Sequence, residues 1–66
     1  MQRSRSFYDR QPLLNFVNKN VLVVCRSRDQ FYGKLRLVGQ YEILLESDGK
    51  LIVIFKHAIE YIAEIF

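Results

Sequence analysis

The sequence predicts a mainly β domain in which one N-terminal α-helix precedes five short antiparallel strands that bend strongly into a small barrel. Three observations support this fold class. The hydrophobic period changes from helical to alternating near residue 21. Gly33 interrupts the second alternating run, where a strand turning a barrel corner needs to bend. Turn residues separate the later runs, and Asp48-Gly49 is the strongest of these signals.

The N-terminal segment divides into a flexible basic arm, residues 1–6, and the start of a single domain, residues 7–66. We expect a helix over about 9–18, with Asp9 as its cap and Pro12 in its first turn. Asn18-Lys19-Asn20 then ends it. The apolar stripe of this helix comprises Leu13, Leu14, Phe16 and Val17.

The first three strands are expected at about 21–27, 30–38 and 41–47, with the polar turn SRDQ between the first two. The alternation of the second strand places one set of side chains toward the core and another toward solvent. The inward set is Phe31, Leu35 and Leu37, and the outward set is Tyr32, Lys34 and Arg36. In the third strand, Ile43 and Leu45 are expected to point inward.

The last two strands, expected at about 50–56 and 58–64, differ because the first of them is apolar at every position from Leu51 to Phe55. A strand of this kind must be covered on both faces. A chain of 66 residues has little else to cover it, so a second copy is the simplest cover, paired at an open strand edge. The sequence therefore predicts a small SH3-like barrel that forms homo-oligomers.

Composition excludes several kinds of site. The single cysteine, Cys25, cannot form an internal disulfide, and with the single histidine it cannot build a Cys/His zinc site, so we expect no metal and no cofactor. Apolar runs are too short to span a membrane and no leader-like segment is present, which favours a soluble cytoplasmic protein. His57 has no nucleophile or paired carboxylate at a recognisable spacing, so we expect no enzymatic activity.

The charge is unevenly distributed around the net value of +3. Residues 1–36 carry eight Lys/Arg and two acids, giving +6, whereas residues 37–66 carry two Lys/Arg and five acids, giving −3. One face or edge is therefore expected to be basic, and a polyanion such as nucleic acid is its natural partner.

Three stretches, PLLNF, GQYEILLES and above all IFKHAI, resemble Hfq, the bacterial Sm-like RNA chaperone family. The resemblance covers roughly residues 8–64. It implies the Sm fold and a ring, normally a hexamer, in which strand 50–56 of one subunit pairs with strand 58–64 of the next. It also implies binding of U-rich single-stranded RNA, both small RNA and messenger RNA, in post-transcriptional regulation.

The resemblance further implies a uridine pocket near the ring's pore, on the proximal face, formed by Gln40, Tyr41, Phe55, Lys56 and His57. Tyr41 would stack on a base, and Gln40 would hydrogen-bond its edge. Lys56 would meet a uracil carbonyl or a phosphate, and His57 a phosphate or the 2′-hydroxyl.

This chain departs from the family pattern in several places. The family's uracil-reading glutamine near the helix start has two candidates here, Arg10 and Gln11, and Gln11 is the one we assign to the pocket. Gly39 stands where an acidic residue is usual.

At the rim of the ring, Asn15 and Lys19 are the candidate RNA contacts. The family's arginine-rich patch is missing there, so RNA binding by basic residues at the rim is either reduced or moved to Arg3, Arg5 and Arg10. The A-rich distal site is poorly matched by Val24, Cys25, Arg26, Arg28, Asp29, Gln30 and Tyr32.

Structural interpretations compete with these functional ones. Arg26 and Arg28 fit an ordinary charged turn or a phosphate contact equally well. Tyr32 is expected to cover the barrel, and Cys25 to be a small buried group. At the level of the whole protein, the alternative is an Sm-like ring that serves as a structural or protein-interaction scaffold with weak RNA affinity. A third hypothesis is a monomeric SH3-like domain that binds peptides.

Overall fold

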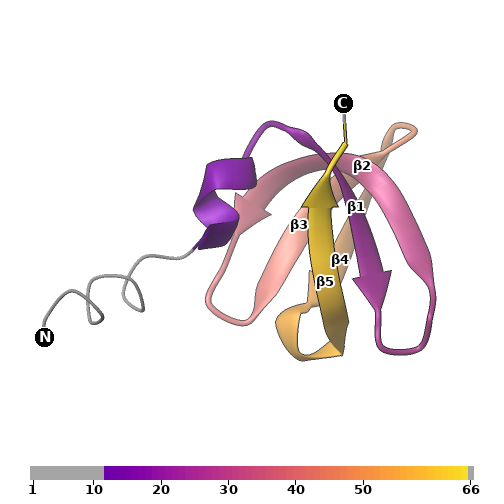
Figure 1. Cartoon of the computed structure of the whole chain (residues 1–66). Coiled ribbons are helices and arrows are strands. Elements are labelled where there is room, and N and C mark those ends of the chain that lie inside the picture. Colours follow the sequence, from indigo (N-terminus) through magenta and orange to yellow (C-terminus); the bar gives the residue numbers. More distant parts are fainter. Residues whose placement is uncertain (1–11, 66) are drawn as a thin grey trace, which may run out of the picture.

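The computed structural model describes residues 12–65, which contain five strands and two short 3-10 helices. In chain order these are η1 (Pro12–Phe16), β1 (Asn20–Cys25), β2 (Gln30–Val38), β3 (Glu42–Ser47), β4 (Lys50–Phe55), η2 (Lys56–Ala58) and β5 (Ile59–Glu64). Figure 1 shows one strongly curved sheet with η1 beside it.

All strand pairs are antiparallel, and the spatial order is β4-β3-β2-β1-β5. This order confirms the mainly β fold class. The two outermost strands, β4 and β5, do not pair with each other, so the hydrogen-bonded sheet is bent but unclosed. This agrees with the strongly bent SH3-like barrel with open strand edges expected from the sequence, and the short η2 connection turns between β4 and β5 without joining them in a ladder.

Gly33 lies at the bend of β2, as predicted. The first half of β2 pairs with β1 and the second half with β3, and Lys34 has a partner on both sides. A Cβ at Gly33 would collide with the backbone carbonyl of Glu46 and lie 3.2 Å from Leu45 Cγ. Only a residue without a side chain lets β3 approach this closely.

The alternation predicted for β2 fails at Leu37, which is 62% exposed rather than inward. The reason is a β-bulge. Leu35 pairs with Leu45, but Leu37 pairs with Leu44, so the register shifts between them and Arg36 is the extra residue. Because side chains alternate with a period of two, one extra residue turns Leu37 to the opposite face.

The core lies inside the curve of the sheet. Ile43 and Leu45 are fully buried, which confirms the prediction for β3, and Leu35 is buried with them. Cys25 is a free thiol in this cluster and is 7% exposed, consistent with a small apolar group. The remaining core side chains come from β1 and β4: Val21, Val23, Val24 and Ile54.

The predicted N-terminal helix differs from the structure over its described part. It is a 3-10 helix over Pro12–Phe16 and ends before residue 18, because Asn18 adopts the left-handed conformation with φ 69°. Asn18 N donates to Leu35 O at 2.6 Å, which ties this end to β2. The arm over residues 1–6, Arg10, Gln11 and the proposed cap Asp9 lie outside the described residues.

Four strands, β1, β3, β4 and β5, also differ from their predicted bounds. β1 stops at Cys25, since Arg28 N donates to Cys25 O at 2.9 Å and closes a tight turn. β3 begins at Glu42 because Gly39 N donates to Glu42 O at 2.7 Å and holds residues 39–41 as a loop. β4 and β5 are separated by the three residues of η2. Within residues 12–65, no helix is long and apolar enough to cross a membrane.

Candidate functional site

The candidate site begins at η2, where β4 turns into β5. Phe55 before it (φ −78°, ψ 138°) and Ile59 after it (φ −94°, ψ 130°) are both extended, and Ile59 N donates to Lys56 O. A single 3-10 turn therefore changes the chain direction between two strands without glycine or proline. This explains how Lys56 and His57 occupy a tight corner between two apolar runs.

Two backbone hydrogen bonds hold η2 between neighbouring turns. Lys56 N donates to Tyr41 O at 2.8 Å, which joins η2 to the β2–β3 loop. Arg26 N donates to Ala58 O, also at 2.8 Å, which joins it to the β1–β2 turn. We call this arrangement of residues 26–29, 39–41 and 55–58 the corner. Figure 1 shows the three segments at the same end of the sheet.

The corner brings together five of the residues assigned to the uridine pocket. Gln40, Tyr41, Phe55 and His57 are exposed, and Lys56 is half-buried. Tyr41 is 66% exposed, so its ring has a face open to solvent. The Phe55 and His57 rings are stacked, with centroids 6.1 Å apart and planes inclined by 26°.

Gly39 occupies a loop position where the related family usually has an acidic residue, and Glu42 places a carboxylate next to it. A side chain at Gly39 would collide with the Glu42 carboxylate, whose Cδ lies 2.8 Å from the Cβ position. An acidic group therefore lies over this glycine, supplied from three residues later in the chain. Glu42 is also opposite Phe55 in the β3–β4 ladder, which fixes the loop against the end of β4.

This arrangement suits binding to a base and its sugar-phosphate. An exposed tyrosine face supports stacking, an amide hydrogen-bonds a base edge, and ammonium and imidazole groups meet phosphate or carbonyl oxygens. Within the described residues, no group of three or more His, Cys, Asp or Glu side chains is arranged to hold a metal ion.

The other predicted contacts do not join the corner. Gln11 lies outside the described residues. Asn15 is exposed on η1, which packs against β2. Lys19 Nζ lies 4.0 Å from Glu64 Oε2, at the end of β5 remote from η2. The rim candidates are thus separate from the pocket, and the charge of Lys19 is partly offset.

The region compared with the family's distal face is divided by burial. Val24 and Cys25 are 9% and 7% exposed, so they cannot contact a ligand without rearrangement. Arg26, Arg28 and Asp29 are exposed in the turn that follows. Gln30 and Tyr32 are also exposed, and both line a groove over β2.

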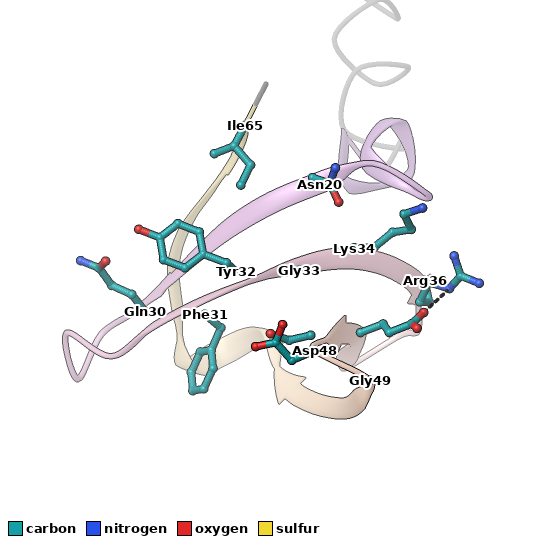
Figure 2. A pocket seen from close by; sticks show the side chains of 12 residues that line it. Asn20, Gln30, Phe31, Tyr32, Gly33, Lys34, Arg36, Asp48, Gly49 and Ile65 are labelled. Carbon is teal, nitrogen blue, oxygen red and sulfur yellow. Dashed lines mark ion pairs between the residues drawn. The ribbon is translucent and has the colours of Figure 1, made fainter.

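A groove of about 890 Å³ lies over β2 and the β3–β4 turn, and sequence reasoning missed it. Figure 2 shows Tyr32, Lys34 and Asp48 around it, and the ion pair in which Arg36 Nε lies 3.2 Å from Glu46 Oε1. Tyr32 is 54% exposed here, on the outward face that the alternation of β2 predicts for it. Gly33, at the bend of β2, is among the residues that line the groove, and its position in the strand was the only sequence signal nearby.

Comparison with solved structures identifies a relative. The crystal structure of Hfq, described as a pleiotropic translational regulator, aligns with a TM-score of 0.74 and 31% sequence identity. The alignment covers 79% of this chain and 82% of that one. No family model matches the sequence, and no curated protein matches it. The identity and coverage, together with the bent five-stranded sheet and the corner after β4, show that this chain belongs to the Hfq family of Sm-like proteins.

Proposed function

We propose that this protein binds U-rich single-stranded RNA at the corner and acts as an RNA chaperone in small RNA-mediated regulation in the cytoplasm, as a homo-oligomeric ring of six subunits. It performs no catalysis. The observation that carries this proposal is the position of η2, hydrogen-bonded on one side to the loop that bears Gln40 and Tyr41 and on the other to a basic turn.

Each side chain of the corner has a separate role. Tyr41 stacks on a base, a contact worth about 1–3 kcal/mol. His57, backed by the stacked ring of Phe55, is directed to the phosphate or the 2′-hydroxyl that distinguishes RNA from DNA. The backbone of Lys56 is hydrogen-bonded to that of Tyr41, and we assign its ammonium to the same nucleotide.

The free sheet edges support assembly into a ring. β4 and β5 each have one unpaired edge in the single chain. On β4 the side chains of Leu51, Val53 and Phe55 are 65%, 55% and 54% exposed, although this strand is apolar throughout. Burying each aliphatic side chain contributes roughly 1.5–3 kcal/mol. Pairing of β4 with β5 of the next subunit covers this surface and satisfies both edges.

A ring also explains how a shallow site binds tightly. One corner offers the exposed ring of Tyr41 and three cationic side chains, those of Arg26, Arg28 and Lys56, which gives weak binding by itself. Several copies engaging one strand act through effective concentration, which raises overall affinity by about 10²–10⁴.

Binding of a fluorescent U6 oligomer, followed by anisotropy, tests this function. We expect Lys56→Ala and His57→Ala each to weaken binding about tenfold or more while native mass spectrometry still reports an intact ring. Lys50→Ala, which removes an exposed cation at the other end of β4, is the control and should bind normally. Unchanged affinity in both corner variants would refute the uridine pocket.

The scaffold hypothesis is favoured by one observation, the ion pair that offsets Lys19 at the rim. It expects intact rings that ignore both U6 and A18 oligomers. Measuring assembly and RNA binding on the same sample therefore separates a binding ring from a scaffold ring.

A further inference from the structure

The β1–β2 turn, residues 26–29, presents two arginine side chains beside η2. The turn is closed by Arg28 N donating to Cys25 O and by Cys25 N donating to Asp29 O, both at 2.9 Å. Arg26 and Arg28 are both exposed. A tight, hydrogen-bonded turn thus holds two guanidinium groups at the surface within three residues of each other.

The acid in this turn is engaged with a hydroxyl. Ser27 Oγ donates to Asp29 Oδ2 at 2.9 Å, which directs that carboxylate toward its own turn. Within residues 12–65, neither Arg26 nor Arg28 forms an ion pair, whereas Arg36 and Lys19 both do. The two guanidinium groups of the turn therefore remain available to an external anion.

The turn is continuous with the proposed base pocket. Arg26 N donates to Ala58 O at 2.8 Å on one side of η2, and Lys56 N donates to Tyr41 O at 2.8 Å on the other. Figure 1 places the β1–β2 turn and η2 at the same end of the sheet. The corner thus has an aromatic and amide end at Gln40 and Tyr41, and a guanidinium end at Arg26 and Arg28.

The backbone of Arg28 carries a further indication. Its φ is 81°, a left-handed conformation that is unfavourable for a long side chain and natural for glycine. Arginine at this position has a stability cost that glycine would avoid. Strained backbone of this kind is concentrated at functional sites.

We propose that Arg26 and Arg28 bind phosphate groups of the same RNA strand whose bases are held at Tyr41 and His57. Guanidinium groups match phosphate in a planar, two-bond geometry, so this contact adds affinity without reading bases. It rests on the proposed function, because it extends the RNA path from the base pocket across η2. It assigns the turn to backbone binding of that strand and not to adenine recognition.

The test compares two variants with equal loss of charge. Arg26→Gln/Arg28→Gly removes both guanidinium groups and keeps the turn, since glycine suits the backbone at position 28. Lys34→Gln/Lys50→Gln removes two exposed cations away from the corner, one in the groove and one at the start of β4. Binding of U6 is measured by anisotropy from about 50 to 300 mM salt.

We expect the arginine variant to reduce the slope of log affinity against log salt by about 0.7 for each lost phosphate contact, hence about 1.4 per engaged subunit. The lysine variant should keep the wild-type slope. Arg26→Lys/Arg28→Lys, which retains both charges, should recover most of the wild-type slope. If the arginine double variant does not assemble, the single variant Arg26→Gln tests the inference instead. Its expected decrease in the slope of log affinity against log salt is about 0.7.

Equal slopes in the arginine and lysine variants would overturn the inference. Failure of the proposed function has a different signature, because Lys56→Ala and His57→Ala would then leave U6 affinity unchanged. If those two variants lose affinity and the arginine variant does not, the base pocket stands and only the phosphate path is wrong.

Discussion

The corner and the groove over β2 each combine an exposed tyrosine with basic residues, yet their charges are organised differently. In the groove, Arg36 is ion-paired with Glu46, and Asp48 lines the same surface as Lys34. In the corner, the guanidinium groups of Arg26 and Arg28 have no ion-pair partner within residues 12–65.

The two regions are also held differently. Three separate segments meet at the corner through backbone hydrogen bonds to η2. The groove is lined mainly by one strand, β2, and by the β3–β4 turn beside it. The groove is therefore not the better candidate site, although it has a defined volume. Segments tied together by the backbone, with cations left for a ligand, indicate binding more strongly than volume does.

The largest effect is expected from a variant that tests whether RNA binding at the corner depends on assembly of the ring. Val53→Asp places a carboxylate on the exposed face of β4, where the proposed ring would bury it, and an unpaired buried charge is costly. We expect subunits to dissociate and U6 affinity to fall by about 10²-fold or more, since the corners no longer act together. Native mass spectrometry and anisotropy on the same sample measure both quantities.

Tyr32→Asp is the matched control, because Tyr32 is 54% exposed and Val53 is 55% exposed. It introduces the same charge at the groove and should leave assembly intact. Rings that survive Val53→Asp with normal RNA binding would contradict the proposed interface at β4.

The next effect compares the two tyrosines directly. Tyr41→Ala should cost about 1–3 kcal/mol of U6 binding free energy, the value of one base stacked on an aromatic ring. Tyr32→Ala should have little effect, although the two rings are similarly exposed at 66% and 54%. Equal losses would show that RNA uses the groove as well, and the contrast between the two regions would no longer hold.

The smallest effect concerns backbone strain at the two ends of the sheet. Arg28 and Asp48 both have positive φ, 81° and 51°. Arg28→Gly should raise the free energy of unfolding by about 0.5–1 kcal/mol, because relief of strain exceeds the added entropy of the unfolded chain. Asp48→Gly should gain less, since aspartate tolerates the left-handed conformation better.

Thermal melts at matched protein concentration measure this difference, because oligomerisation makes the melting temperature depend on concentration. For a domain of this size, the Arg28→Gly change corresponds to roughly 2–8 °C. A lower melting temperature for Arg28→Gly would mean that the arginine side chain stabilises the turn, contrary to the view that it is retained for binding.

Much of the fold was predictable from local pattern. The alternating runs, the bend at Gly33 and the inward positions of Ile43 and Leu45 follow from residue type and spacing, which act over a few residues. Leu37 was not predictable in the same way. The bulge that exposes it arises where β2 changes partners, and the pattern of one strand does not contain that information.

The candidate site was predictable in its residues but not in its connections. IFKHAI marks the segment at η2, and its resemblance to one family identified Gln40 and Tyr41 as neighbours. The backbone hydrogen bond from Arg26 N to Ala58 O joins residues that are 32 positions apart in the chain (58 − 26), so no local motif indicates it. The same is true of the ion pairs that offset Lys19 and Arg36.

The sequence by itself determined which segments become strands, which of them is too apolar for one chain to cover, and which side chains stand at the turn between the last two. The tertiary structure alone decided which turns meet at η2 and which basic residues face an acid. The physical reason is range: hydrophobic period and turn chemistry act over neighbouring residues, whereas the meeting of distant charges depends on strand register and on the curvature of the whole sheet.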